Sequence, residues 1–321
     1  MTAIADTPPR FSHEVLLYAS PREFAERCAA FVREGLDADE PVLVMVTADK
    51  IELIRAELGD AAGRVSFADM AEAGRNPGRI ISAWADFAAE HLAERRPLRG
   101  IGEPIWAGRS ADELIECQHH ESLLNLAFGD AGGFRLLCPY DTSALPREVI
   151  EEAHRSHPLI LDGEALRACD RYRAPGAAAV ARRPLAPPRA PSQEVVFGKS
   201  ELRTVRRFVS REAAEAGLPA RRAGDLVVAV NEVTTNSVRH GGGGGLFRIW
   251  HDSDAIVCEI RDRGRIEQPL VGRRRPATGA EGGHGLWMAN QVCDLVQVRS
   301  RRGGTVVRLH MRLETPAEAA A

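Results

Sequence analysis

Residues 231–245 read NEVTTNSVRHGGGGG, and this stretch decides the fold of the C-terminal part of the chain. Glu232, Asn236 and His240 recur every four residues, so they form one polar stripe on a helix of 3.6 residues per turn. The run of glycine after the stripe has no side chains for chemistry and is expected to end the helix. A neighbouring apolar face, which would pack against a sheet, contains Leu226, Val230 and Val233.

The polar stripe carries side chains that suit nucleotide chemistry. An asparagine oxygen can ligate Mg²⁺, and a carboxylate one helical turn earlier can orient or deprotonate a nucleophile. We therefore take Asn236 as the candidate magnesium ligand and Glu232 as the candidate catalytic residue. His240 is expected to be a helix-end residue rather than an acid or a base.

Two glycine-containing motifs follow the helix, D-R-G at 262–264 and G-G-H-G-L at 282–286. Alone, either motif would also suit an ordinary turn, and the polar stripe would also suit a solvated helix face. Three motifs in this order, each with suitable secondary structure around it, favour a nucleotide-binding site instead.

The order of asparagine helix, D-x-G and G-x-G resembles the Bergerat-type (GHKL) ATP-binding fold, and its anti-sigma-factor serine kinases match best, over residues 194–314. The resemblance implies an α+β sandwich with helices on one face of a mixed or antiparallel sheet. It implies that Asn236 ligates the Mg²⁺ that bridges the phosphates and that Asp262 accepts a hydrogen bond from the adenine amino group. Gly264 would keep side-chain bulk away from the base, and Thr305 would lie near it.

The same resemblance implies how the phosphates are held and transferred. Gly283 and Gly285 would open the N-terminus of a helix so that backbone N–H groups meet phosphate. Glu232 would help to activate the attacking hydroxyl of a partner protein, while Mg²⁺ and positioned donors stabilise the transferred charge. The candidate donors are Arg239, His240 and the arginine run 273–275, for which a solvated loop is an equal alternative.

The resulting prediction is a signal-responsive anti-sigma regulatory factor in the cytosol that uses ATP and Mg²⁺. The resemblance implies two protein partners, a sigma factor that is sequestered and an anti-sigma-factor antagonist that is phosphorylated on Ser or Thr. The alternative is a stoichiometric ATP-binding partner protein without kinase activity, and a binding module with a degenerate site also stays open, as does a homodimer. A histidine autokinase is not favoured, because residues 174–230 contain no histidine to phosphorylate.

Length and composition restrict the class of protein. The 321 residues exceed what one hydrophobic core usually holds, which predicts two domains. A hydrophobic content of 44% with 27% charged residues is typical of a soluble globular protein, and a net charge of −3 excludes bulk attraction to nucleic acid or an anionic membrane. No secretory pattern or membrane-length apolar stretch is present. The six scattered cysteines fit reduced thiols in a cytosolic protein.

Residues 10–170 alternate short apolar runs with amphipathic stretches, which predicts an α/β domain with a largely parallel sheet and helices on both faces. An Ala- and Pro-rich linker at 174–193 separates it from the ATP-binding domain at 194–314. The expected strands of the first domain are 14–18, 42–46, 65–68 and 135–139, and its expected helices are 21–34, 50–58, 80–95, 111–127 and 146–154. The second domain is expected to have helices at 200–216, 220–239 and from 285 to before 294, and strands at 246–251, 255–261, 295–300 and 305–312.

Three segments of the first domain, at 13–18, 102–106 and 136–141, resemble the MEDS sensory domain of methanogen and methylotroph regulators. The resemblance spans residues 11–160 and implies that this domain receives a signal, without specifying a ligand.

Metal or redox ligands could also be proposed in the first domain, from Cys117, His119 and His120 together with His13 and Cys138. Cys117 and His120 are three residues apart on an expected helix and could share a face. No second close pair completes a tetrahedral set in the local sequence, so a buried thiol and surface imidazoles are the favoured interpretation.

Overall fold

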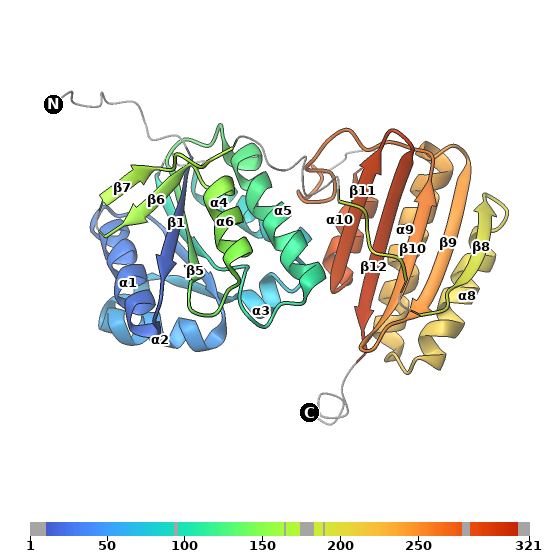
Figure 1. Ribbon diagram of the computed structural model, residues 1–321, viewed down its shortest axis with the longest axis horizontal. Helices are drawn as coiled ribbons and strands as arrows, with labels where there is room; N and C mark the ends of the chain where they lie inside the picture. The colour runs from blue at the N-terminus through green and yellow to red at the C-terminus, as the bar shows by residue number, and fades with distance from the viewer. Residues whose placement is uncertain are drawn as a thin grey trace. The chain divides into compact units, whose positions relative to one another are not determined.

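The structure is a computed structural model that describes residues 11–92, 96–163, 165–173, 183–188, 190–277 and 283–313. The chain divides into two compact units, Met1–Ala177 and Ala178–Ala321, which are described separately (Figure 1). Among the described residues, no helix is both long and apolar enough to cross a lipid bilayer.

The first unit is built on a seven-stranded sheet in the order β3-β2-β4-β5-β1-β6-β7. Its neighbouring strands run parallel, except that β6 and β7 form an antiparallel pair. The strands are β1 (Ser12–Tyr18), β2 (Val42–Val46), β3 (Ser66–Asp69), β4 (Leu98–Gly102), β5 (Phe134–Asp141), β6 (Leu159–Asp162) and β7 (Ala165–Ala168). The α-helices are α1 (Pro21–Asp37), α2 (Ala48–Leu58), α3 (Met70–Ala73), α4 (Ile80–Leu92), α5 (Ala111–Phe128) and α6 (Arg147–Ser156).

Alternation along these strands sends side chains into two layers. On one face Leu16 and Leu137 pack with apolar side chains of α1 and α2 in a buried core. On the other face Gly100 leaves room for Trp84 of α4, because a Cβ atom at Gly100 would lie 2.6 Å from the indole ring. Helices therefore cover both faces of a largely parallel sheet, which confirms the predicted fold class (Figure 1).

The strands and helices expected in the first unit are present, with ends that differ by a few residues. Helix α4 ends at Leu92, and the expected continuation to Arg95 falls on residues outside the described set. Strand β4 is not predicted, because its sequence LRGIG places an arginine and two glycines in a strand that is buried throughout. Strands β6 and β7 are not predicted either, since both have only four residues, β6 is mostly half-buried and β7 is exposed throughout.

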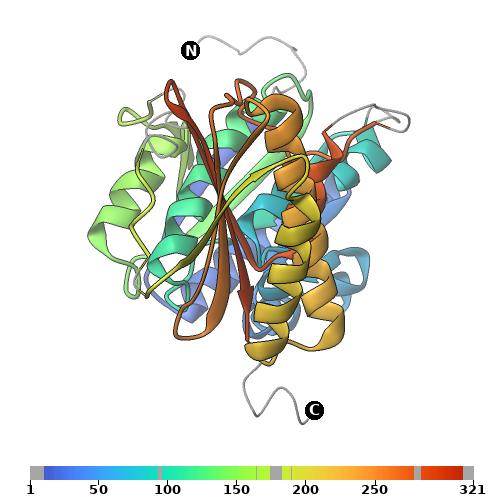
Figure 2. The same ribbon diagram turned by 90° about the vertical axis from the view of Figure 1, so that its right-hand side faces the viewer.

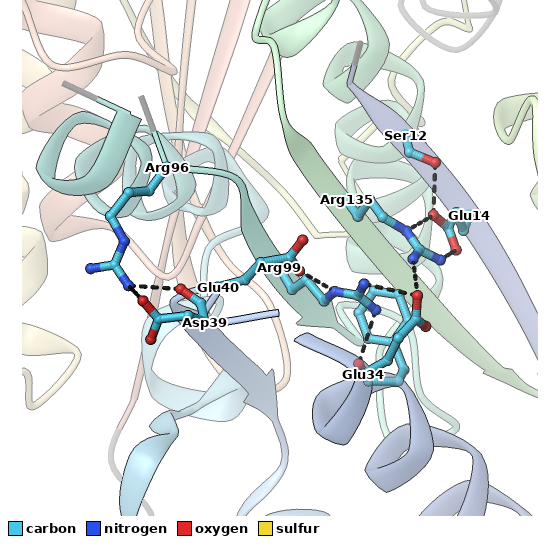
Figure 3. A network of polar contacts seen from close by, with 9 residues as sticks. Ser12, Glu14, Glu34, Asp39, Glu40, Arg96, Arg99 and Arg135 are labelled. Carbon is cyan, nitrogen blue, oxygen red and sulfur yellow. Dashed lines mark hydrogen bonds and ion pairs between the residues drawn. The ribbon is translucent and has the colours of Figure 1, made fainter. Parts of the chain in front are cut away.

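Two arginines, one buried and one half-buried, join the sheet to α1 at the N-terminal ends of the parallel strands (Figure 3). Arg99 of β4 is 3% exposed and binds both Glu34 and Glu40. Arg135 of β5 forms hydrogen bonds of 2.8 Å to Glu14 of β1 and 2.9 Å to Glu34 of α1. Two arginines thus share the Glu34 carboxylate, so three strands are connected to one helix by charge-assisted hydrogen bonds.

The second unit is a five-stranded antiparallel sheet in the order β11-β12-β10-β9-β8. The apolar stripes of its helices pack on one sheet face. In Figure 2 the yellow and orange helices lie along one side of this sheet. This arrangement confirms the predicted α+β sandwich. Its strands are β8 (Gln193–Gly198), β9 (Gly244–His251), β10 (Ala255–Asp262), β11 (Leu295–Arg301) and β12 (Gly304–Arg312), and its helices are α8 (Leu202–Glu215), α9 (Ala220–His240) and α10 (His284–Val292).

The elements expected in the second unit are present, and β8 is an addition at the end of the expected linker. Part of that linker, residues 183–188, lies along the sheet. The guanidinium of Arg299 donates to the carbonyl oxygen of Arg183 at 3.0 Å, and that of Arg308 donates to the carbonyl oxygen of Ala186 at 2.8 Å. The described part of the linker is therefore bound to β11 and β12.

Candidate functional site

A cavity of about 650 Å³ lies between α9, α10, the loop after β10 and the ends of β10 and β12. Residues from all three sequence motifs meet at its wall. The sequence-predicted residues that line it are Asn236, His240, Asp262, Gly264, Gly283, Gly285 and Thr305. The structure therefore brings the three motifs, at 231–245, 262–264 and 282–286, together with Thr305 at one cavity wall.

The carboxylate of Asp262, at the end of β10, is held in a fixed orientation. The hydroxyl of Ser237 on α9 donates to Oδ2 at 2.6 Å, and the backbone N–H of Gly264 donates to Oδ1 at 2.7 Å. Each carboxylate oxygen retains a further lone pair, so Asp262 can still accept a hydrogen bond from a ligand. Ser237 is not among the predicted site residues, although it stands one position after Asn236 in the quoted stretch.

Two glycines give this end of the cavity its shape. A Cβ atom at Gly241 would lie 2.5 Å from Cγ of Asp262, and a Cβ atom at Gly264 would lie 2.7 Å from the carbonyl oxygen of His240. A side chain at either position would displace the backbone or the carboxylate. Both glycines therefore have a packing role where β10 meets the end of α9, and the expectation that Gly264 keeps bulk away from a base stays a prediction.

Thr305 acts on the loop that borders the cavity. Its hydroxyl donates to the carbonyl oxygen of Gly264 at 2.9 Å and lies 2.9 Å from the hydroxyl of Ser300 on β11. Ser300 in turn accepts a hydrogen bond of 2.8 Å from the backbone N–H of Ile266. The closing hairpin β11–β12 thus fixes the start of the loop, a contribution of Ser300 that no sequence motif indicates.

The other end of the cavity is formed by the start of α10, which lies close to the polar stripe of α9. Gly283 precedes the helix with φ +87°, a left-handed conformation that favours glycine. A Cβ atom at Gly285 would lie 2.6 Å from Nδ2 of Asn236 and 3.2 Å from Oε2 of Glu232. The glycine therefore allows both side chains to reach the first turn of α10, where backbone N–H groups are unsatisfied by the helix. Glu232 stands beside the lining residues rather than among them.

Of the predicted phosphate donors, His240 lines the cavity, whereas Arg239 and the arginine run 273–275 do not. Arg239 is exposed near the end of α9 and does not line the cavity, and His240 is the last residue of α9. The arginine run is bound to α10: the amide of Asn290 donates to the carbonyl oxygen of Gly272 at 2.9 Å, and Arg275 stacks over Trp287. Arg273 is buried, so a fully solvated loop does not describe this run.

In the first unit, the expectation of surface imidazoles is wrong. His119 and His120 are 7% and 1% exposed on α5, and the expected buried thiol, Cys117, donates to the carbonyl oxygen of Pro104 at 3.2 Å. His13 and Cys138, the other two residues considered, do lie together, with 3.4 Å between Nε2 and Sγ. Local spacing could not indicate that contact, because the two residues are 125 positions apart.

Comparison with known families assigns both units. Residues 12–158 match the family described as MEDS, the methanogen/methylotroph DcmR sensory domain. Residues 198–311 match the histidine kinase-like ATPase domain.

Two individual proteins show weaker likeness. Glutamate–tRNA ligase 1 of Novosphingobium aromaticivorans is 29% identical over 118 residues, which are 33% of this chain and 26% of that enzyme. The crystal structure of the RsbU and RsbW domains of Rv1364c from Mycobacterium tuberculosis is similar with 24% identity and a TM-score of 0.31, over 40% of this chain and 34% of that one. The chain thus spans about a quarter of the curated relative. From the two family matches, the chain carries an N-terminal MEDS domain and a C-terminal histidine kinase-like ATPase domain.

Proposed function

We propose that the C-terminal domain binds Mg·ATP in the cavity between α9, α10 and β10. The observation that carries this proposal is the placement of two different polar groups at the two ends of one cavity. The oriented carboxylate of Asp262 stands at one end, and Asn236 and Glu232 meet the first turn of α10 at the other. A cavity of about 650 Å³ is large enough for a nucleotide.

Asp262 fits the recognition of adenine. The amino group of adenine is a donor, and the carboxylate keeps acceptor capacity after its bonds to Ser237 and Gly264. Guanine has a carbonyl oxygen at the corresponding position, which would face the carboxylate without a hydrogen bond. Gly241 and Gly264 both line the cavity, and the lack of side chains at these positions would keep bulk away from a planar base.

The opposite end fits phosphate and a hard cation. Backbone N–H groups at the start of α10 favour an anion, and the side-chain oxygen of Asn236 is a ligand that Mg²⁺ accepts. A bound Mg²⁺ would neutralise phosphate charge, and Asn236 would hold it. Glu232, one turn earlier on α9, would orient or deprotonate the hydroxyl of a protein substrate.

We propose further that this domain belongs to a cytosolic, signal-responsive anti-sigma regulatory factor. It would phosphorylate Ser or Thr of an antagonist protein and sequester a sigma factor. The support for this finer function is the resemblance of the three motifs to anti-sigma-factor serine kinases, together with the retained Glu232–Asn236 pair. The MEDS domain would supply the signal.

A second candidate is a stoichiometric ATP-binding partner protein without kinase activity. The observation that favours it is the position of the arginine run, which is bound to α10 through Gly272 and Trp287 and does not line the cavity. In such a protein the nucleotide would order the partner surface, and no phosphate would be transferred.

Calorimetry of the full chain with Mg·ATP tests the nucleotide site. Asn236→Ala is expected to weaken Mg²⁺-dependent binding of ATP, whereas Asn231→Ala on the same helix is the matched control, since Asn231 pairs with Arg206 and does not line the cavity. Equal Mg·ATP affinity in wild type and Asn236→Ala would refute the metal assignment. Incubation with γ-labelled ATP and candidate antagonist proteins then separates the kinase from the stoichiometric binder.

A further inference from the structure

Four side chains of the types that bind metal ions lie together in the interior of the MEDS domain. His13 lies on β1, Cys138 on the neighbouring strand β5, Glu121 on α5, and His157 directly after α6. His13 pairs with Leu136 in the parallel register, so Cys138, two residues further on, points to the same sheet face. All four side chains are at most 1% exposed. Helix α5, which carries Glu121, is joined to the end of α6, which precedes His157, by a hydrogen bond of 2.8 Å from Asn125 to the carbonyl oxygen of Ser156.

The four ligand atoms converge on one point. Oε2 of Glu121 lies 3.1 Å from Nε2 of His13 and 3.3 Å from Nε2 of His157. Sγ of Cys138 lies 3.4 Å from Nε2 of His13, and all four atoms are within 4.8 Å of one another. A tetrahedral zinc site with ordinary bond lengths has ligand atoms about 3.3–3.8 Å apart. The cluster therefore already has nearly the dimensions of a filled site.

Hydrogen bonds among the described residues do not satisfy every polar atom of this cluster. Nδ1 of His157 is 2.8 Å from the carbonyl oxygen of Ala153, so that nitrogen must carry a proton. The Nε2 atom of a neutral His157 then directs a lone pair at Glu121. Nε2 of His13 faces both a carboxylate oxygen and a sulfur, and one ring nitrogen cannot serve both with a single proton. Oε1 of Glu121 has no hydrogen-bond partner among the described residues.

We propose that His13, Glu121, Cys138 and His157 bind one divalent transition-metal ion of the zinc class. Two imidazoles, one thiolate and one carboxylate are a ligand set that Zn²⁺ and Co²⁺ accept in tetrahedral geometry. The thiolate and the carboxylate together balance the charge of the ion, so the filled site is neutral in an interior that disfavours net charge. The contact of Nδ1 of His157 with a backbone carbonyl is the outer hydrogen bond that orients a metal-binding histidine.

Binding changes the protonation of one ligand. The metal–sulfur bond forms as the S–H bond of Cys138 breaks, and the proton is released to solvent, with no oxidation or reduction. The site is closed, because four protein ligands fill a tetrahedral shell. It joins β1, β5, α5 and the end of α6, so the ion would fix the helices to the sheet on this face of the domain.

Metal analysis of the full chain tests the site. The protein is purified, supplied with excess Zn²⁺ and dialysed against metal-free buffer, and its metal content is measured by mass spectrometry. We expect one Zn²⁺ per chain in wild type and in Cys117→Ser, whose thiol is equally buried but bonds to Pro104. Cys138→Ser is expected to lose at least nine-tenths of the metal. Equal retention by Cys138→Ser would overturn the proposal.

Cobalt substitution provides a test that requires no variant. Wild-type protein loaded with Co²⁺ is expected to show a sulfur-to-cobalt charge-transfer absorption together with the intense visible bands of tetrahedral Co²⁺. This spectrum should persist in Cys117→Ser. If wild-type protein binds neither metal stoichiometrically and shows no such absorption, the cluster is a metal-free ion pair of Glu121 with a protonated histidine, and the proposal is refuted.

Discussion

The hydroxyl of Ser237 on α9 donates a 2.6 Å hydrogen bond to the carboxylate of Asp262 on β10. Helix and sheet are therefore joined at the residue proposed to read the base. Because Ser237 follows Asn236 directly, one segment of α9 contributes to both the base end and the phosphate end of the cavity. A small change in this turn should affect nucleotide binding without removing any group that contacts the phosphates.

Ser237→Ala is expected to weaken ATP binding, since Asp262 loses the donor that orients it. We expect a loss of roughly 5- to 30-fold in affinity, the equivalent of about 1–2 kcal/mol. Thr234→Val is the matched control, because the hydroxyl of Thr234 is buried on the same helix and, among the described residues, donates to the backbone carbonyls of Val230 and Asn231. Unchanged affinity in Ser237→Ala, measured by calorimetry, would show that Asp262 needs no orientation from α9.

GTP is expected to bind at least tenfold more weakly than ATP. A carboxylate left without its donor in a partly buried site costs about 1–3 kcal/mol, which corresponds to this discrimination. Competition of ATP and GTP against a fluorescent ATP analogue measures the ratio. Equal competition by the two nucleotides would contradict the role given to Asp262.

Glu232→Gln should slow phosphoryl transfer while leaving nucleotide affinity nearly unchanged. The substitution keeps the shape beside Gly285 but removes the base, and loss of a general base typically lowers the rate about 10²–10⁴-fold. The rate is measured at saturating ATP with an antagonist protein that wild type phosphorylates. Asp225→Asn removes a carboxylate from the same helix outside the cavity and should keep the wild-type rate. A wild-type rate in Glu232→Gln would refute the role of Glu232 as general base, whereas the absence of transfer by wild type to any antagonist would favour the stoichiometric binding protein.

The arginine network of the first unit should contribute stability that depends on pH. Hydrogen bonding from Arg99 lowers the pKa of Glu34 from its ordinary 4.5 to about 2. A lowered pKa in the folded state means that the stabilisation is present above pH 4.5 and is lost as the pH falls towards 2. The side chain of Glu34 is 60% exposed, so solvent screening keeps the effect below about 1 kcal/mol.

Urea unfolding of wild type and Glu34→Gln, from pH 6 down to about pH 2, measures this contribution. The difference in free energy of unfolding between wild type and Glu34→Gln should be largest near pH 6 and vanish at about pH 2. Glu26→Gln, on the same helix with a solvent-exposed partner in Arg22, serves as control. A difference that is independent of pH would show that the charge of Glu34 is not responsible.

The quoted stretch predicted α9 and its polar face because the positions that matter repeat with the period of the helix. That Asp262 and Gly285 lie near this polar face is a prediction from the order of the motifs rather than from any local pattern. Ser237, Ser300 and Gly241 could not be ranked in this way, since each acts through a contact that only the folded backbone creates. Their residue types alone suit many surface positions equally well.

The first unit shows a different limit. Strand β4 could not be predicted, because Gly100 leaves room for Trp84 and does not contribute to an alternation of apolar side chains. The cluster of His13 with Glu121, Cys138 and His157 joins residues more than 100 positions apart, so no spacing rule for metal ligands applies to it. Tertiary packing, not local sequence, creates both features.

The segment 183–188 enters the ATPase domain along the hairpin β11–β12, of which β12 also borders the cavity. Arg299 and Arg308 hold its backbone, while Ser300 and Thr305, on the same strands, hold the loop beside the proposed nucleotide. A mechanical pull on the chain before residue 183 would thus be transmitted to this hairpin first. The closing hairpin is the anchor at which tension along the connecting segment would reach the loop.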